Sequence, residues 1–245
     1  MALFTFSIIT LIIYIIIFII LYKILKSILK TIISIILISI VILGVFGFLV
    51  YLDFNNLKTN FPNSKNMVLF ENKGITAGII IDKNQEIILL KKQYINNLKT
   101  QDKNTILKNQ NLFKIITFNI NTIKESNLKA ITLESLTLTK EQIIAILESE
   151  DAFAETKAQL SLPIDIKNIP LKFNDKTIAL EDQAQLKAII YASALKGILI
   201  EDTSYVIGEY SKNNIKVYKE TIIFKILKLL PTDTINNIVN KNIYK

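Results

Sequence analysis

The chain has 245 residues, a formal net charge of +8 and no His, Cys or Trp. Its 29 basic residues are all lysines. Without His and Cys there can be no histidine general base, no cysteine nucleophile, no Ser-His-Asp triad and no zinc site of the ordinary kind. What remains for catalysis is Ser or Thr with Lys, paired carboxylates, Tyr, or a hard metal held by oxygen ligands.

The first 52 residues contain two almost unbroken apolar runs, Met1–Tyr22 and Thr31–Leu52, each 22 residues long. A helix of that length covers roughly 33 Å, enough for a hydrocarbon core of about 30 Å. A cleaved signal peptide is disfavoured, because no basic residue precedes Lys23 and no small-residue cleavage motif precedes the lysines. A soluble core helix is disfavoured because neither run has a polar face. We therefore expect two transmembrane helices, at about 3–22 and 31–52.

The connector between the runs carries Lys23, Lys26 and Lys30, the only charged side chains of the first 52 residues. We expect these lysines to lie at the membrane interface and to reach anionic phosphates. The connector has no Gly, Pro, Asn or Asp to break a helix, so two arrangements remain open. One is a hairpin of two spanning helices; the other is one long helix, of which a single run could span. We favour the hairpin, because a continuous helix would leave one whole apolar run in water.

The lysines also predict an orientation. The connector has three, the tail before it has none, and the residues soon after Leu52 include Lys58 and Lys65. Lysines near membrane spans prefer the cytoplasmic side, which places the connector inside and the C-terminal domain outside the cytoplasm. We thus expect a multi-pass protein of the cell membrane, with the lipid bilayer as a partner.

The lysines of the remaining chain are spread out and mixed with Asp and Glu. Nucleic-acid binding predicts clustered basic residues interleaved with aromatic ones, with Arg for bidentate contacts. We therefore expect no nucleic-acid partner.

Residues 53–66 are rich in turn formers and contain Pro62, which predicts a juxtamembrane linker before an extramembrane domain at 67–245. Residues 91–108 are polar and predict a solvated segment or a polar helix. Aliphatic or alternating segments predict strands at Met67–Phe70, Ile75–Ile81, Glu86–Leu90, Leu112–Ile120, Tyr205–Tyr210 and Ile215–Lys219.

The middle of the domain gives mixed signals. Ala130–Leu138 alternates with one slip of phase, which predicts a single strand with a β-bulge. Thr139 and Gln142 form a capping-box pattern, so a helix is expected from Thr139. Two prolines in the stretch 161–170 suggest a division of the domain into two lobes there.

Three further elements are expected towards the C-terminus. Leu171–Leu180 predicts a small hairpin, and Glu181–Lys196 predicts a helix ended by Gly197. Thr221–Leu230 is apolar apart from two lysines on one helical face. We favour a core element packed on the sheet for this last segment; the alternative is an amphipathic segment lying on the membrane.

Ser193 and Lys196 match the S-x-x-K pattern, in which a lysine activates a serine one helical turn away. Ser211-Lys212-Asn213 is an imperfect companion motif, and no K-T-G occurs. Ser27 and Lys30 show the same pattern by chance, so its specificity is low. A surface serine and lysine near a helix end explain Ser193 and Lys196 better, and the catalytic residues, if any, stay unknown.

Paired carboxylates occur at Glu150-Asp151, Glu181-Asp182 and Glu201-Asp202. Such pairs can hold Mg²⁺ or Ca²⁺, or act as acid and base in glycoside hydrolysis. Each pair lies at an expected element boundary, where capping and solvation account for it. The stretch 74–78, GITAG, lacks the spacing of a nucleotide-binding loop and predicts a turn. We expect no metal and no cofactor.

These observations predict an α+β protein, with an N-terminal transmembrane helical hairpin followed by a mainly antiparallel sheet domain with two or three helices. The favoured function is a membrane-anchored, non-catalytic module that binds a protein partner or assists assembly at the membrane surface. The alternative is a membrane-tethered hydrolase that uses Ser and Lys, or carboxylates with a hard metal.

Overall fold

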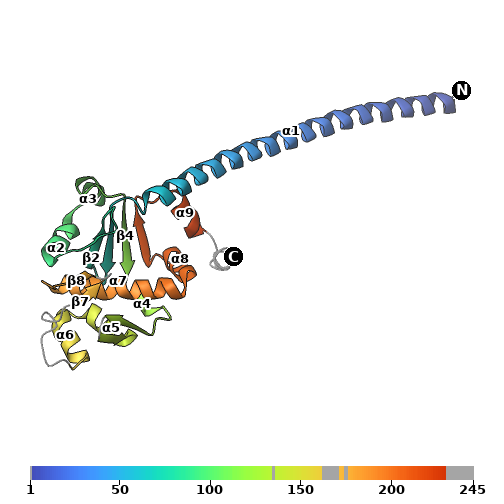
Figure 1. The fold of residues 1–245 in the computed structure, drawn as a ribbon. Helices are drawn as coiled ribbons and strands as arrows, with labels where there is room; N and C mark the ends of the chain where they lie inside the picture. The colour runs from blue at the N-terminus through green and yellow to red at the C-terminus, as the bar shows by residue number, and fades with distance from the viewer. Residues whose placement is uncertain (1, 134–135, 162–170, 174–175, 230–245) are drawn as a thin grey trace. The chain divides into compact units, whose positions relative to one another are not determined.

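The computed structural model describes residues 2–133, 136–161, 171–173 and 176–229 (Figure 1). The chain divides into two compact units, Met1–Leu52 and Asp53–Lys245. The second unit is an α+β fold with a mixed sheet and several helices.

Helix α1 (Ala2–Asn60) runs without interruption over 59 residues, and such a helix is roughly 88 Å long. The hairpin predicted from helices at 3–22 and 31–52 is therefore not seen. The lysine connector holds only residues that tolerate a helix, so nothing turns the chain there. Within the described residues, the segment Ile28–Asn60 is long and apolar enough to cross a membrane. The helix also takes in the first part of the predicted linker and ends just before the Phe61-Pro62 bond, as expected for a proline.

The second unit is built around a five-stranded sheet in the order β3-β2-β1-β4-β9. The β1–β2, β2–β3 and β4–β9 pairs are antiparallel, whereas the central β1–β4 pair is parallel. The sheet is thus mixed: three of its four strand pairs are antiparallel, in line with the mainly antiparallel sheet that was expected, and the central pair is parallel. The strands are β1 (Asn66–Glu71), β2 (Ile75–Ile81), β3 (Ile87–Leu89), β4 (Lys114–Asn119) and β9 (Ile215–Tyr218).

The described part of this unit holds more helices than the two or three expected. Several are short and begin at a side chain that caps them: Asp102 accepts hydrogen bonds from the amides of Asn104 and Thr105, and the predicted capping box of Thr139 and Gln142 is present. The helices are α2 (Lys92–Thr100), α3 (Lys103–Asn109), α4 (Asn121–Lys124), α5 (Lys140–Glu148), α6 (Ala152–Gln159), α7 (Gln183–Glu201), α8 (Thr203–Ser211) and α9 (Ile222–Leu229).

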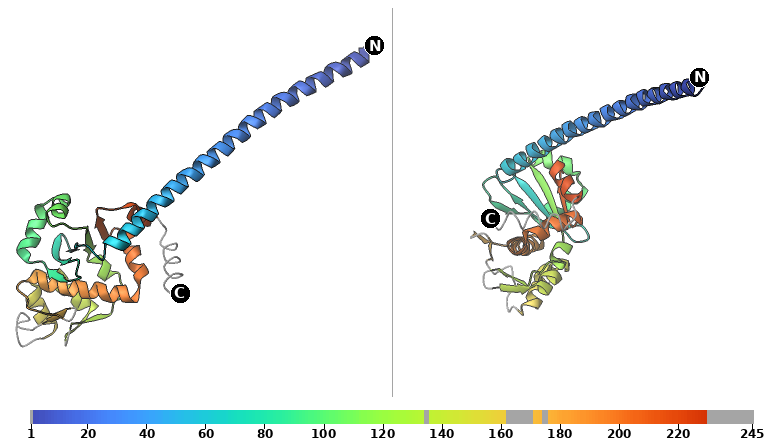
Figure 2. Two further views of the ribbon diagram at one scale, coloured as in Figure 1. Left: turned by 45° about the horizontal axis from the view of Figure 1, so that its top comes forward. Right: turned by 90° about the vertical axis from the view of Figure 1, so that its right-hand side faces the viewer.

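Helices lie on both faces of the sheet. The side chains of Met67 and Leu69 pack with α2 and α3 on one face, and those of Val68 and Phe70 pack with α7 on the other. Beyond α7 lie α5 and α6, so α7 is a middle layer (Figure 2). A helix with neighbours on two sides is apolar over most of its circumference, and Leu186–Tyr191 are all buried. The one charged residue in this stretch, Lys187, donates to the Ser149 carbonyl at 2.6 Å.

Two small hairpins complete the described elements. The strands β5 (Ala130–Leu133) and β6 (Leu136–Thr139) pair antiparallel, as do β7 (Leu171–Phe173) and β8 (Lys176–Ile178). The single bulged strand predicted at Ala130–Leu138 is therefore wrong, because its slip of phase separates two paired strands. Residues 162–170, which hold most of the predicted lobe boundary, lie outside the described residues.

Two predictions near the C-terminal end are also wrong. Gly197 does not end its helix, since α7 continues to Glu201. The predicted strand Tyr205–Tyr210 is helical and belongs to α8. Its start has a local cause, because the Asp202 carboxylate accepts a hydrogen bond from the amide of Tyr205 at 3.1 Å.

Candidate functional site

An apolar groove lies between the sheet and the C-terminal half of α7, entirely within the second unit. Its volume is about 460 Å³. Among the described residues, one lysine is the only charged side chain that lines it. The lining side chains are Phe61, Val68, Phe70, Ile79, Ile81, Ile87, Ile116, Phe118, Ala192, Leu195, Lys196, Leu199 and Ile200.

The groove exists because α7 covers only part of its sheet face. Near the middle of α7, the rings of Tyr191 and Phe70 stack with centroids 4.3 Å apart, and the Tyr191 hydroxyl donates to the Phe118 carbonyl at 3.4 Å. Burial raises the pKa of Tyr191 well above its usual range, so this hydroxyl stays a donor. Towards its end the helix turns apolar side chains to solvent: Leu199 is 43% exposed and Ile200 is 76% exposed.

Gly197 contributes to this geometry in a way the sequence did not suggest. A Cβ atom at this position would lie 3.0 Å from Leu128 Cδ1, which is tighter than an ordinary contact. The glycine thus allows α7 to pass close to Leu128 while the helix continues. Its continuation carries the chain to Leu199 and Ile200, which form one wall of the groove.

The sequence candidate Lys196 lies in the groove, but without a catalytic partner. Lys196 is exposed, Ser193 is half-buried, and no hydrogen bond joins the two in the described part of the chain. The two side chains of the companion motif at 211–212 have other partners. The Ser211 hydroxyl donates to the Gly208 carbonyl at 2.7 Å, and Lys212 pairs with Glu209 at 2.7 Å. The arrangement therefore offers one cationic group at an apolar surface rather than an activated nucleophile.

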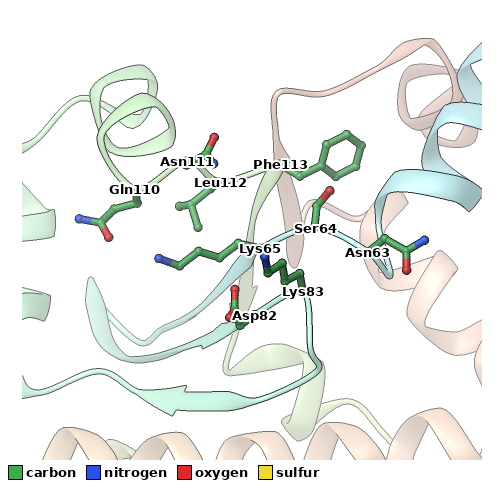
Figure 3. Close-up of a pocket in the computed structure, with 9 residues that line it drawn as sticks. All are labelled: Asn63, Ser64, Lys65, Asp82, Lys83, Gln110, Asn111, Leu112 and Phe113. Carbon is green, nitrogen blue, oxygen red and sulfur yellow. The ribbon is translucent and has the colours of Figure 1, made fainter.

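A second, polar cavity of about 540 Å³ lies at the end of the sheet where β1 begins and β2 ends (Figure 3). Lys65, Asp82 and Lys83 come together at its centre, whereas the Phe113 ring points away from them. A backbone hydrogen bond joins two segments of the cavity wall: the Phe113 amide donates to the Lys65 carbonyl at 2.8 Å. Two lysines and one carboxylate make this a polar surface, and the described residues bring no set of metal ligands together there. The lining residues are Asn63, Ser64, Lys65, Asp82, Lys83, Gln110, Asn111, Leu112 and Phe113.

The acidic pairs serve as caps and ion-pair partners. The Asp151 carboxylate accepts from the amides of Phe153 and Ala154 at the start of α6, and that of Asp182 accepts from two amides at the start of α7. Glu181 pairs with Lys91 at 2.6 Å, and Asp202 caps α8. Among the described residues, no group of three or more acidic side chains is placed to hold a metal ion.

The remaining sequence candidates occupy ordinary positions. Residues 74–78 form the β1–β2 turn and the start of β2, where Gly74 has φ of +130°. Lys23, Lys26 and Lys30 lie on α1 and are exposed, spaced so that they share one helical face. That placement is compatible with the predicted interfacial role and does not test it.

Three charged side chains are buried among the described residues, and the sequence marks none of them. Lys187 of α7 donates to the Ser149 carbonyl at 2.6 Å; the other two are Lys114 and Glu209. Lys114 is 2% exposed, lies over the rings of Phe113 and Phe224, and donates to the Lys219 carbonyl. Burial lowers the pKa of Lys114, which the carboxylate of Asp53 partly offsets. Glu209 is fully buried and accepts from Lys212 and from the Asn214 amide group, both at 2.7 Å. Lys114 lies on strand β4 and Glu209 on helix α8, and no pattern in the neighbouring sequence indicates that either side chain is buried.

No family model matches the chain, no curated protein matches it, and no solved structure matches it. The groove, the polar cavity and the apolar N-terminal helix are therefore the features from which a function is inferred.

Proposed function

We propose that the protein is a membrane-anchored, non-catalytic module whose apolar groove binds an apolar segment of a protein partner at the membrane surface. The observation that carries the proposal is the groove between the sheet and the end of α7. Ligand sites in proteins are concave and mostly apolar, with few polar groups, and volumes of about 300–1,000 Å³ are typical. The groove fits this description at about 460 Å³ with a single charged side chain, Lys196.

The position of exposed apolar side chains supports the same proposal. Leu199 and Ile200 lie side by side on the groove wall, and Phe61 at the groove is 37% exposed. Contiguous apolar surface on a folded domain marks binding sites more often than isolated exposed residues do. A helix or strand with apolar side chains at regular spacing is the kind of partner that such grooves accept.

The proposal includes anchoring through the apolar N-terminal segment, with the domain on the extracytoplasmic side. Its support is the segment Ile28–Asn60 and the three lysines that precede the run 31–52. A single span through 31–52 and a hairpin of two spans both place the domain on that side. They differ in the location of the N-terminus, which is cytoplasmic with one span and external with two.

Photo-cross-linking in the intact membrane tests the groove. A photoreactive phenylalanine analogue at Ile200 should form an adduct with a protein partner, because this side chain is 76% exposed on the groove wall. The matched control is the same analogue at Ile88, which is 50% exposed and belongs to β3 but points to the opposite face from Ile87. Equal protein adducts at both positions would contradict the proposal.

A charge on the groove floor provides the second arm of that test. Ile116→Asp should remove the adduct at position 200, because a carboxylate in an apolar groove loses its hydration without gaining a partner. Ile88→Asp places the same charge outside the groove and should leave the adduct intact. Adducts with lipid alone at position 200 would also exclude a protein segment as the occupant.

Single cysteines can determine the topology, because the chain contains no Cys of its own. An impermeant thiol reagent added to intact cells should label Asn84→Cys in the exposed β2–β3 turn if the domain is external. Labelling of Ala2→Cys then separates two spans from one. Protection of the cysteine at position 84 until the membrane is broken would overturn the proposed orientation.

A further inference from the structure

Helix α9 is an apolar helix without a core to enter. Six of its eight residues are Ile, Leu or Phe, yet none of the eight is buried, and Leu229 is 83% exposed. The helix packs on α8, and its Phe224 ring lies beneath the Lys114 ammonium of β4. Because none of its residues is buried, the core position favoured for Thr221–Leu230 from the sequence is not confirmed. A helix that is strongly amphipathic and carries lysines beside an apolar face is typical of helices that lie in a membrane interface.

The inner side of α9 is identified by its contacts. The Phe224 ring meets the Tyr210 ring edge-on at 5.5 Å, and Lys228 pairs with Glu220 at 2.6 Å. The pKa of Glu220 is lowered by its hydrogen bond from Lys228, so this carboxyl is ionised at neutral pH. Lys228 is thus committed to the domain, whereas Lys225, three residues earlier, is exposed.

The helical spacing then gives the opposite side. Positions 222, 226 and 229 follow one another at intervals of four and three, and lie on the side of the helix away from Phe224 and Lys228. These positions hold Ile222, Ile226 and Leu229, with Lys225 at the margin. Leu229 and Lys225 are exposed, whereas Ile222 and Ile226 are half-buried, so this side of α9 is apolar, partly open to solvent, and cationic at its edge.

A hydrogen bond within the second unit ties α9 to the point where the apolar N-terminal run ends. The Ile223 amide donates to the Asp53 carboxylate at 2.8 Å, which satisfies one free amide at the start of α9. Asp53 directly follows Leu52, the last residue of the apolar run. The first turn of α9 is therefore bound to the residue that directly follows the proposed span in the chain.

We propose that α9 lies in the membrane interface, with Ile226 and Leu229 among the acyl chains and Lys225 at anionic phosphates. This inference rests on the anchoring part of the proposed function and not on the groove. A bilayer is chosen over a protein because the Asp53–Ile223 bond holds α9 at the residue that follows the proposed span in the chain, and because the exposed charges next to and within α9, Lys219 and Lys225, are both positive. Anionic lipid headgroups complement that charge.

The chain contains no Trp, so one introduced tryptophan reports a single position. The probe is the full chain with Leu229→Trp, reconstituted in vesicles of phosphatidylcholine and phosphatidylglycerol with brominated acyl chains. Leu229 is 83% exposed, so the substitution does not disturb packing. We expect blue-shifted emission that the bromine atoms quench. The control, Ile88→Trp at a position 50% exposed, should show unshifted and unquenched emission in the same vesicles.

Lys225→Gln in the Leu229→Trp background tests the headgroup contact. One lysine near an anionic surface changes a partition constant about fivefold. In the anionic vesicles, Lys225→Gln should therefore lower the ratio of quenched to unquenched tryptophan about fivefold. In vesicles of phosphatidylcholine alone, Lys225→Gln should have no effect. An equal effect in both lipids would overturn the assignment of Lys225 to anionic phosphates.

Flotation of the vesicles separates the ways in which these ideas can fail. If the protein floats and the reporter at position 229 is unquenched, the inference about α9 is overturned and the anchor stands. If the protein does not float, anchoring and the inference fall together. Emission that is blue-shifted but insensitive to bromine would mean that protein covers α9, by a second copy or another contact, and would overturn the lipid assignment. None of these outcomes depends on the partner of the groove.

Discussion

The two faces of the five-stranded sheet come from the same strands but differ in how completely they are covered. Against α2 and α3, Met67 and Ile115 are fully buried. Against α7, Ile87 and Ile116 are half-buried, and Ile200 of the helix itself is 76% exposed. Apolar content does not explain the difference, because both faces are rich in Ile. What differs is the cover. The short helices α2 and α3 close their face except at the edge strand β3, where Ile88 is 50% exposed, whereas α7 leaves a groove over the other face.

This comparison separates residues that stabilise the fold from residues available for binding. A face that is closed has no room for a ligand and should be sensitive to any change in volume. A face that is open should tolerate substitution in the isolated protein and should be sensitive only when a partner is measured. The predictions below test that division, beginning with the largest expected effect.

Neighbouring isoleucines of β4 give a matched pair. Ile115→Ala should lower the free energy of unfolding by about 2–5 kcal/mol, because the deleted atoms leave a cavity in a closed core. Ile116→Ala should cost about 1 kcal/mol, because the side chain is half-buried and faces the groove. Urea unfolding of the detergent-solubilised protein, followed by tyrosine fluorescence, measures both. Equal losses would show that the two faces are equally packed.

Adding volume should produce the same contrast. Gly78→Ala places a Cβ atom 2.9 Å from Leu69 Cδ2 and 3.1 Å from the Val68 carbonyl oxygen, so the strand must shift. We expect a loss of about 1–3 kcal/mol in the free energy of unfolding. Ala192→Leu adds three heavy atoms towards the groove and should change that energy by less than about 0.5 kcal/mol. A large loss for Ala192→Leu would mean that the groove is not open in solution.

Much of the fold could be predicted from local patterns. Strand β2 was predicted with its observed bounds, Ile75–Ile81, and β1, β3, β4 and β9 were predicted to within a few residues. Helix α5 was predicted from its capping box. The failures have local causes: at Ala130–Leu138 a reversal between two strands resembled a bulge, and at Tyr205–Tyr210 alternating side chains outweighed the cap provided by Asp202. The parallel pairing of β1 with β4 is non-local, and no short-range pattern encodes it.

The candidate site was less predictable than the fold. The groove depends on where α7 ends relative to the sheet, and that depends on Gly197, a residue that was taken as a helix stop. The apolar residues Ile198, Leu199 and Ile200, beyond the expected helix, were the one signal present in the sequence. Lys196 was noticed only as half of a catalytic pattern, whereas the structure places it at an apolar surface.

Lys114 lies on the same face of the sheet as the groove, but it is buried beside the Phe224 ring of α9. It alternates with Ile116 and therefore points to the same side of β4, but it is 2% exposed there. In the folded state, burial lowers the pKa of Lys114 below its ordinary value of 10.5. Between these two pKa values, the unfolded chain therefore binds more protons than the folded one. The free energy of unfolding should therefore rise as the pH increases towards 10.5.

Lys114→Met should reduce this rise, since methionine fills a similar volume without a titrating group. Part of the rise should remain, because burial also lowers the pKa of Lys187. At neutral pH the change in the free energy of unfolding should stay within about 1 kcal/mol, because relief of a buried charge offsets the lost bond to the Lys219 carbonyl. Urea unfolding at several pH values between neutral and alkaline measures both effects. Lys108→Met, at an exposed position of α3, is the control. An unchanged pH dependence in Lys114→Met would show that another group titrates.

The smallest expected effect on stability is at the groove wall. Ile200→Asp replaces a side chain that is 76% exposed, so the free energy of unfolding should change by less than about 0.5 kcal/mol. The same substitution should abolish the cross-link between the groove and its partner, because a charge at the wall would lose hydration on binding. Ile88→Asp should be equally neutral for stability and should not affect the cross-link. If Ile200→Asp instead destabilises the protein as strongly as a change in the closed core, Ile200 packs against the domain in solution, and the open face is a structural surface rather than a binding one.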